Sequence, residues 1–367
     1  MRIKSVEVYQ YRIPFHPVFG KARTRRFRRP ARAVRSGILL RLVGIHEFES
    51  WGEISPLPGR STESLNEASK VVLSVIDDLV GSRLPASWAE LKEMSTTEGM
   101  PSSCRFGIEQ AVSCLSASAA GVPLSMWINP EARHHVRVNA LLAGSVDEVV
   151  HQATQRVREG FDVFKLKVGG FDIEREQSKV RKVRELLGSD PELRLDANRS
   201  WDFETTVRFL KGIEDQQIAY VEEPLLNSSE LRELSGETTI PLAVDESVEE
   251  MMQSPCDTHD WSYLAAAVLK PTLCRGMLGT MAWAEHFLQA KVEPVVTSAF
   301  ETAIGLSGIT AMAAAIGGSG WAAGLDTLRY LSDKELTDDP DLGCPERRAV
   351  SLADWAHVDT ARLERIH

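Results

Sequence analysis

Apolar and polar residues follow two different rhythms along the chain. In the first part, three segments alternate with a period of two, as strands with one buried face do: residues 6–13, 38–43 and 51–54. They predict a three-stranded antiparallel sheet. Residues 65–79 carry apolar side chains at helical spacing instead, with Ser61 or Thr62 expected as the N-cap. Further helices are expected over residues 88–94 and 106–120, which makes this part an α+β domain.

From Val136 onward, short apolar runs alternate with helical patterns. We expect eight strands, near residues 136–142, 163–168, 193–197, 218–222, 241–245, 265–269, 292–297 and 321–324. Helices are expected between them, for example over 145–159, 173–187, 203–212 and 275–289. This alternation is typical of an α/β fold with a parallel sheet, and eight strands favour a closed barrel. No Gly-x-Gly-x-x-Gly follows a strand, which disfavours a dinucleotide-binding sheet.

The change of rhythm predicts three parts. Residues 1–125 form the α+β capping domain, residues 126–330 the barrel, and residues 331–367 a polar segment that packs back on the capping domain. Residues 95–103 are expected to be a loop.

Composition narrows the classes of function. The chain has 367 residues and a net charge of −10, which argues against general nucleic-acid binding, and no apolar run is long enough for a membrane span. Its five Cys are an odd number without metal-ligand spacing, so reduced thiols in a cytoplasm are expected. The pattern does not predict an oligomeric state. Residues 21–35 contain eight Lys or Arg, either a solvated loop or a flap that attracts a carboxylate substrate.

Charged residues recur where the predicted barrel strands end. Lys167, Asp196, Glu222, Asp245 and Lys270 follow one another at steps of 29, 26, 23 and 25 residues. One strand–helix unit of an eight-stranded barrel takes about 31 residues, and barrel enzymes keep their chemistry at the carboxyl ends of the strands. The five side chains are therefore expected to converge at one mouth.

Three of these residues are predicted metal ligands. Asp196, Glu222 and Asp245 supply only oxygen atoms, a donor set that suits Mg²⁺, with Mn²⁺ as a possible substitute. A single acid at a strand end is more often a helix cap or a surface charge, but three at one-unit spacing are harder to explain that way. Glu223 and Glu246 should point away from the ligands, because side chains alternate along a strand.

The lysines predict acid–base chemistry. Lys165 and Lys167 share one face of their strand, and neighbouring ammonium groups are expected to lower one another's pKa toward that of a base. Lys270 comes from the far side of the ring, so a substrate between it and Lys167 would meet an amine on each face. The simpler alternative is that the lysines only balance the acids. Together the groups predict proton abstraction beside a carboxylate, with the anion stabilised by a divalent cation.

These motifs resemble the enolase superfamily, muconate-lactonizing subgroup. The resemblance rests on Lys165-x-Lys167, Asp196, Glu222-Glu223-Pro224, Asp245-Glu246-Ser247 and Lys270-Pro271, and it implies a modified (β/α)₇β TIM-like barrel with an N-terminal α+β capping domain. Lysine bases with Mg²⁺ are the known chemistry of this superfamily. It implies Lys167 as the base, Lys165 as its partner and Lys270 as a cation across the substrate ring.

Longer strings are similar to the o-succinylbenzoate synthase family: residues 51–59, 193–199, 269–273 and 324–327. This similarity implies the dehydration of a small cyclic dicarboxylate in menaquinone biosynthesis. It also implies a substrate-binding set, namely Ser298, Arg194, Asn198, Leu57, Pro58 and Gly324. N-succinylamino acid racemases and dipeptide epimerases of the same superfamily are the alternative, since one ring of lysines and acids can serve both reactions.

Overall fold

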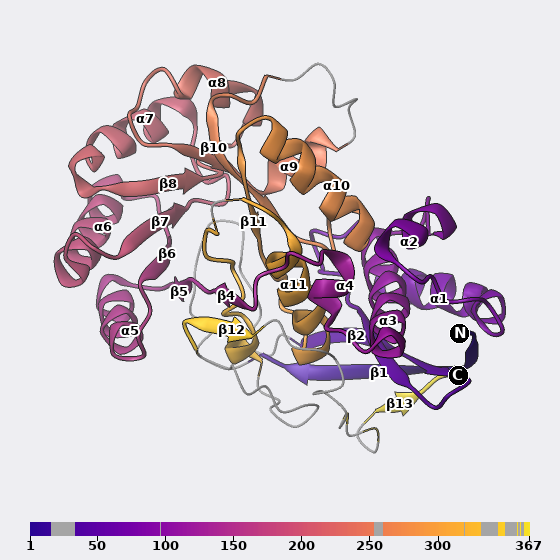
Figure 1. Ribbon diagram of the computed structural model, residues 1–367. Helices are drawn as coiled ribbons and strands as arrows, with labels where there is room; N and C mark the ends of the chain where they lie inside the picture. The colour runs from indigo at the N-terminus through magenta and orange to yellow at the C-terminus, as the bar shows by residue number, and fades with distance from the viewer. Residues whose placement is uncertain are drawn as a thin grey trace.

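The computed structural model describes residues 1–15, 34–95, 97–252, 260–318, 320–331, 344–348, 358, 360 and 363–367. An antiparallel sheet with its helices lies beside a larger body of parallel strands ringed by helices (Figure 1). Most of the basic segment 21–35 lies outside the described residues, as does Cys256. Its last residue, Arg35, is buried and donates to the carbonyls of Ser55, Pro56 and Phe300, so this cation does not face solvent.

The N-terminal sheet confirms the three expected antiparallel strands and adds a fourth. The order is β13 (Glu364–Arg365), β1 (Ile3–Pro14), β2 (Val34–Gly44) and β3 (Glu49–Ile54). Four helices follow the first three strands: α1 (Leu65–Leu79), α2 (Trp88–Met94), α3 (Ser102–Ala120) and α4 (Leu124–Ile128). The predicted domain boundaries remain a prediction.

The N-cap of α1 is Ser64, so the expectation of Ser61 or Thr62 was wrong. The Ser64 hydroxyl accepts from the Glu67 amide, and the Glu67 carboxylate accepts from the Ser64 amide. This reciprocal box needs a Glu or Gln three residues after the cap. Ser61 and Thr62 are followed at that spacing by Ser64 and Leu65, so neither can form it.

The parallel sheet runs in chain order and confirms the α/β barrel. Its strands are β5 (Ala140–Leu142), β6 (Val163–Lys167), β7 (Glu192–Asp196), β8 (Ile218–Glu222), β9 (Leu242–Val244), β10 (Leu264–Leu269) and β11 (Glu293–Val296). The helices that follow these strands are α5 (Val146–Arg158), α6 (Ile173–Leu187), α7 (Phe203–Lys211), α8 (Leu231–Leu234), α9 (Glu246–Met251), α10 (Gly276–Gln289) and α11 (Ala303–Ala315). They cover the outer face of the strands (Figure 1).

The two ends of the barrel sequence differ from the expectation. The strand expected over 136–142 is split into β4 (His135–Arg137), which pairs with β12 (Glu346–Arg348), and β5. The expected eighth strand, residues 321–324, forms only isolated parallel bridges, Val138 to Ala323 and Thr297 to Gly324. We call this thin join between β11 and β5 the seam. Short apolar segments cannot by pattern alone be told apart as strands or as bridged loops.

β3 packs closely on α3. A Cβ on Gly52 would lie 1.9 Å from the Gly107 carbonyl oxygen of α3, so only glycine allows this approach.

β3 also joins the capping sheet to the barrel. The buried Glu53 carboxylate accepts from the amides of Thr302 (2.9 Å) and Gly305 (2.9 Å) at the start of α11, and from Tyr11 Oη (2.5 Å). A carboxylate there satisfies orphan amides and favours the helix dipole. Glu53 therefore holds the last barrel helix to the first domain.

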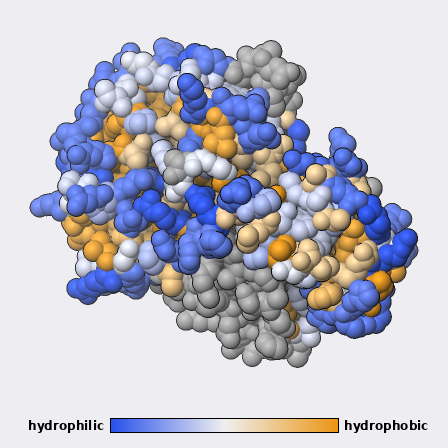
Figure 2. All heavy atoms as spheres, in the orientation of Figure 1, coloured by the Kyte–Doolittle hydropathy of each residue, from blue (hydrophilic) through white to orange (hydrophobic). Residues whose placement is uncertain are grey.

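Most large apolar side chains are packed inside, around the barrel and between the sheet and its helices. Figure 2 shows one face on which charged and polar residues are interspersed with small apolar groups. Among the described helices, none combines the length and the apolar character that crossing a membrane requires.

Candidate active site

The strand register brings the predicted ring together. Lys167, Asp196 and Glu222 are direct partners across β6, β7 and β8. Asp245 follows β9, and Lys270 follows β10. All five residues stand at the carboxyl ends of neighbouring parallel strands, the edge of the barrel at which the fold's enzymes work.

The lysines and acids contact one another in pairs. Lys165 Nζ lies 3.0 Å from Asp196 Oδ2 and 2.8 Å from Glu222 Oε1. Lys167 Nζ forms an ion pair with Asp196, and Lys270 Nζ forms one with Asp245. Five of these six side chains are at most 14% exposed, and Lys167 is 24% exposed. The ring is therefore a nearly buried set of alternating charges that opens toward Lys167.

The pKa values of the buried groups in the ring shift in different directions. Burial alone would raise the pKa of Asp196, but the charges of Lys165 and Lys167 hold it well below its ordinary value. Burial and the charge of Asp196 raise the pKa of Glu222. The expected lowering is not found at Lys165. Burial acts in that direction, but the charges of Asp196 and Glu222 outweigh it and raise the pKa of Lys165, which favours its ammonium form.

Glu223 and its partners hold the loops beneath the ring. Glu223 has a positive φ of 43° and is buried. Its carboxylate accepts from the amides of Asp245 (2.8 Å) and Ser247 (2.6 Å) and from Arg199 Nε (3.0 Å). It thereby points away from the ring, as expected, and fixes where Asp245 leaves β9.

The three acids were tested as a site for a divalent cation. As the side chains stand, no group of three or more His, Cys, Asp or Glu in the described part of the chain is arranged to hold a metal ion. Lys165 Nζ pairs with both Asp196 (3.0 Å) and Glu222 (2.7 Å). Glu222 Oε2 lies 2.7 Å from that nitrogen as an ion pair and accepts no hydrogen bond. Buried carboxylate oxygens of this kind suit a hard cation, so the donor set fits Mg²⁺.

Of the predicted substrate-binding residues, Asn198 lies in the ring. Its Oδ1 accepts from Lys167 Nζ (2.9 Å) and its Nδ2 donates to Glu246 (3.3 Å). Arg194 lies elsewhere: it is fully buried inside the barrel and donates to Glu192 (2.5 Å) and to the Ala322 carbonyl (2.7 Å). These bonds place its guanidinium toward the end of the barrel away from the mouth.

The other four predicted positions lie on three segments. Ser298 follows β11, is buried, and shares a hydrogen bond of 2.6 Å with the Thr327 hydroxyl. Gly324 bridges Thr297, whose side chain would lie 2.6 Å from any added Cβ. Leu57 is buried and Pro58 exposed, both on the segment between β3 and α1. Substrate binding by these residues remains a prediction.

Sequence reasoning missed two arginines beside the ring. Arg60 contacts Asp245, Glu246 and Glu249 from the capping domain. Arg199 binds Glu223, Ser247 and Glu250. Arg199 stands one residue after Asn198 and could have been considered as part of the 193–199 string. Nothing in the sequence pairs Arg60 with acids 185 or more positions away.

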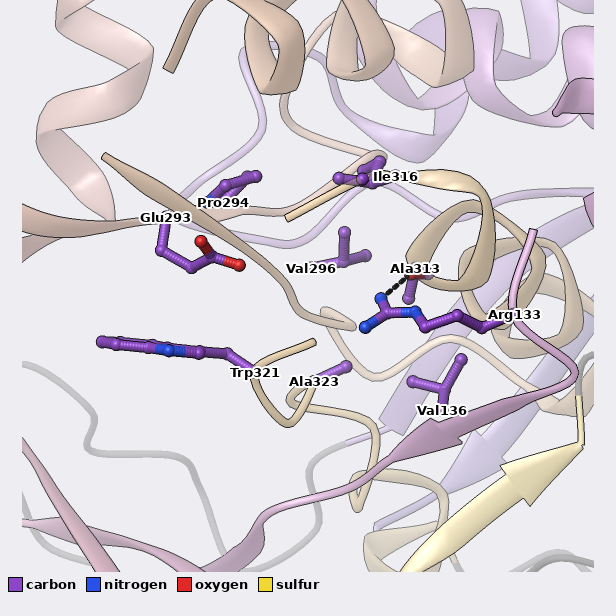
Figure 3. Close-up of a pocket in the computed structure, with 10 residues that line it drawn as sticks. Arg133, Val136, Glu293, Pro294, Val296, Ala313, Ile316, Trp321 and Ala323 are labelled. Atoms are coloured by element: carbon purple, nitrogen blue, oxygen red, sulfur yellow. Dashed lines mark hydrogen bonds between the residues drawn. The ribbon is translucent and has the colours of Figure 1, made fainter. Parts of the chain in front are cut away.

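A small recess lies at the opposite end of the barrel, where β11 begins. Arg133 and Glu293 point into it from opposite sides, and Arg133 donates to the Ala313 carbonyl (2.7 Å) (Figure 3). It holds none of the predicted site residues.

Comparison with protein families assigns both parts of the chain. Residues 148–344 match the model described as enolase C-terminal domain-like, and residues 3–115 match that of the MenC N-terminal domain. The chain is 31% identical to the o-succinylbenzoate synthase of Citrobacter koseri, over 94% of this chain and 97% of that protein. It is 30% identical to that of Pectobacterium atrosepticum, over 95% and 98%.

Solved structures share the fold. The muconate lactonizing enzyme of Pseudomonas fluorescens, complexed with muconolactone, matches with a TM-score of 0.78 at 19% identity, covering 98% of each chain. The dipeptide epimerase of Enterococcus faecalis, complexed with Mg and the dipeptide L-Leu-L-Tyr, matches with a TM-score of 0.79 at 22% identity, over 96% and 99%. The family models, the full-length relatives and the barrel with its strand-end acids agree: this chain belongs to the o-succinylbenzoate synthase family of the enolase superfamily.

Proposed function

We propose that the protein is an o-succinylbenzoate synthase. It dehydrates 2-succinyl-6-hydroxy-2,4-cyclohexadiene-1-carboxylate to o-succinylbenzoate, a step of menaquinone biosynthesis. The relatives that match nearly the whole chain support the substrate. The observation that carries the proposal is the pairing of Lys167 and Lys270 with two acids of one cluster, Asp196 and Asp245.

Asp196, Glu222 and Asp245 would hold Mg²⁺, with Mn²⁺ as a possible substitute. Mg²⁺ is present in a solved epimerase of this fold, and the oxygen-only donor set supports the same ion here. When bound, the cation supplies positive charge against the carboxylate oxygens of the substrate as negative charge develops on them.

The lysines divide the proton chemistry. Lys167 is the most exposed of the three and removes the proton α to the ring carboxylate, since it borders the opening of the ring. Lys165 is held by Asp196 and Glu222 and stabilises the enediolate. The ammonium of Lys270 faces the plane of the substrate's six-membered ring, on the side opposite Lys167, and attracts its π electrons. Loss of the hydroxyl together with the abstracted proton, as water, completes an aromatic ring and balances the reaction.

Racemisation of N-succinylamino acids or epimerisation of dipeptides is the alternative. Both reactions would use Lys167 and Lys270 as acid and base on opposite faces of one α-carbon. Several solved structures of this fold are such enzymes, at 17–22% identity. The full-length relatives at 30–31% identity favour the synthase.

The test is turnover of the cyclohexadiene substrate with Mg²⁺, followed by the absorbance of the aromatic product. Lys167→Ala and Lys270→Ala should each lower kcat by roughly 10²–10⁴-fold, the range of a lost acid–base group. Lys211→Ala is the control, because Lys211 is exposed and pairs only with Glu237. A wild-type protein that forms no aromatic product but racemises an N-succinylamino acid would refute the synthase in favour of the alternative. Full activity in either lysine variant would remove that residue's role.

A further inference from the structure

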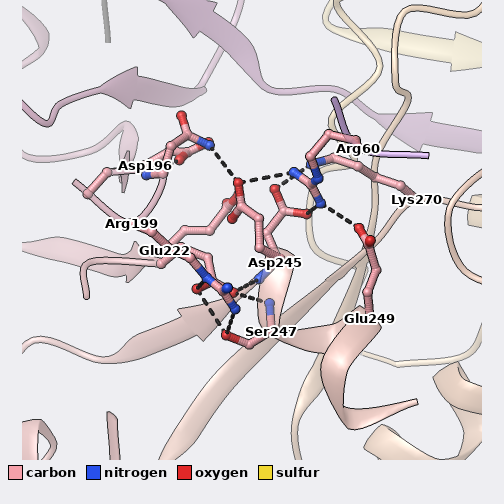
Figure 4. A network of polar contacts seen from close by, with 12 residues as sticks. Arg60, Asp196, Arg199, Glu222, Asp245, Ser247, Glu249 and Lys270 are labelled. Atoms are coloured by element: carbon pink, nitrogen blue, oxygen red, sulfur yellow. Dashed lines mark hydrogen bonds and ion pairs between the residues drawn. The ribbon is translucent and has the colours of Figure 1, made fainter. Parts of the chain in front are cut away.

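Arg60 extends from the N-terminal part of the chain and forms ion pairs with the carboxylates beside the ring. It lies on the segment between β3 and α1, residues 55–64, which we call the capping loop. Its guanidinium lies 2.5 Å from Glu249, 3.0 Å from Glu246 and 3.6 Å from Asp245 (Figure 4). The side chain is only 12% exposed, so solvent screens these contacts weakly.

The capping loop presents Arg60 from a preformed turn. The amides of Arg60 (3.0 Å) and Ser61 (2.9 Å) both donate to the Leu57 carbonyl. The Leu57 amide donates to Ser61 Oγ at 2.8 Å. Three hydrogen bonds within five residues limit the positions that the Arg60 backbone can take, so the arginine transmits the position of the loop to its acidic partners.

Two short chains of contacts lead from Arg60 to the two lysines. Asp245 faces Arg60 with Oδ1 and pairs with Lys270 through Oδ2. Glu246 Oε1 contacts both Arg60 (3.0 Å) and Asn198 Nδ2 (3.3 Å), and Asn198 Oδ1 accepts from Lys167 Nζ at 2.9 Å. Arg60 is therefore one side chain away from Lys270 and two away from Lys167.

We propose that Arg60 is a positioning residue that couples docking of the capping loop to the orientation of both lysines in the ring. The inference rests on the proposed function, because it assigns a role within the same site. Without the arginine, Asp245, Glu246 and Glu249 would face one another with no cation of the capping loop between them. Like charges at such distances repel, and their rotation would release the bonds that orient Asn198 and Lys270.

Arg60→Met tests the coupling, because methionine keeps much of the side-chain volume and removes the charge. The guanidinium contacts of Arg60 given above are all to protein carboxylates. We therefore expect kcat for the cyclohexadiene substrate to fall at least tenfold while KM changes less than threefold. Arg60→Lys should recover part of the loss, since an ammonium restores the charge without the forked geometry. Arg41→Gln is the matched control. Like Arg60, Arg41 pairs with more than one carboxylate, but its partners, Glu7 and Glu49, lie in the N-terminal sheet away from the ring.

Hydrogen exchange of the capping loop gives a second readout that needs no substrate. Amides of residues 55–64 should exchange faster in Arg60→Met than in the wild type and unchanged in Arg41→Gln. Equal exchange in Arg60→Met and wild type overturns the inference whatever reaction the protein catalyses. So does a kcat within twofold of wild type, an equal loss in Arg41→Gln, or a loss confined to KM. A wild type inactive on the cyclohexadiene refutes the proposed function instead, and kcat is then compared on an N-succinylamino acid.

Discussion

Replacing Glu53 should separate the barrel's last helix from the capping sheet. The carboxylate is fully buried and accepts from the amides of Thr302 and Gly305, from the Thr302 hydroxyl (2.5 Å) and from Tyr11 Oη. In Glu53→Ala the two hydroxyls can rotate toward other acceptors. The two amides cannot, because the first turn of α11 fixes their direction.

The magnitude follows from those two amides. A buried donor left without a partner loses about 1–3 kcal/mol, which gives roughly 2–6 kcal/mol for the pair. Removing a negative charge from a helix N-terminus adds about 0.3–1 kcal/mol. We therefore expect Glu53→Ala to lower the free energy of unfolding by roughly 2–7 kcal/mol. Glu53→Gln keeps one acceptor oxygen and should lose less.

The assay is urea unfolding followed by circular dichroism and by tryptophan fluorescence. Glu67→Gln is the control, since Glu67 also caps the start of a helix but on the exposed surface of α1. Its midpoint should shift much less than that of Glu53→Ala. A loss below about 1 kcal/mol in Glu53→Ala, or a loss equal to that of the control, would refute the reasoning that buried amides depend on this carboxylate.

Two further predictions concern a buried ion pair and the metal. Asp326→Ala should lower the free energy of unfolding by roughly 1–3 kcal/mol, because it removes the acceptors of the buried Arg156 Nη2, while Nη1 keeps its ion pair with Glu159. The double variant Arg156→Met with Asp326→Leu should lose clearly less, and a loss as large as that of Asp326→Ala would contradict this. Addition of Mg²⁺ near pH 7 should release protons, measured with an indicator dye, because the raised pKa of Glu222 keeps part of it protonated until a cation binds. Glu222→Gln should release fewer, and a wild type that releases none would remove Glu222 from the ligand set.

The barrel and its ring could be predicted because strand order alone determines them. Lys167, Asp196 and Glu222 recur at one-unit spacing, and parallel strands place such residues at one edge. The position of Arg194 could not be predicted in the same way. It shares a face with Asp196 but precedes it by two residues, about 6.6 Å deeper along the strand. Alternation reports the face of a side chain and not its depth, so the guanidinium bonds Glu192 instead of reaching the mouth.

The direction of the pKa shift of Lys165 could not be predicted from the sequence either. Its neighbour Lys167 is visible two residues away, and this pair suggests mutual repulsion. The carboxylates of Asp196 and Glu222 come from other strands and face the same ammonium at 2.7–3.0 Å. Their attraction outweighs both burial and the second lysine, and only three-dimensional contacts reveal that balance. The ion pairs of Arg60 with Asp245, Glu246 and Glu249 could not be predicted for the same reason.

The seam between β11 and β5 closes the barrel through a very short stretch of chain. Ala323 and Gly324 form backbone hydrogen bonds of 2.8–3.0 Å to Arg137 and Asn139 on one side and to Val296 and Ser298 on the other. Just below the lysines, Trp321 stacks on Tyr220 with ring planes 8° apart, and the Arg194 guanidinium lies against both rings. This stack fills the interior of the barrel beside the seam. We expect this stack to hinder water that enters at the seam from reaching the lysines and acids of the ring.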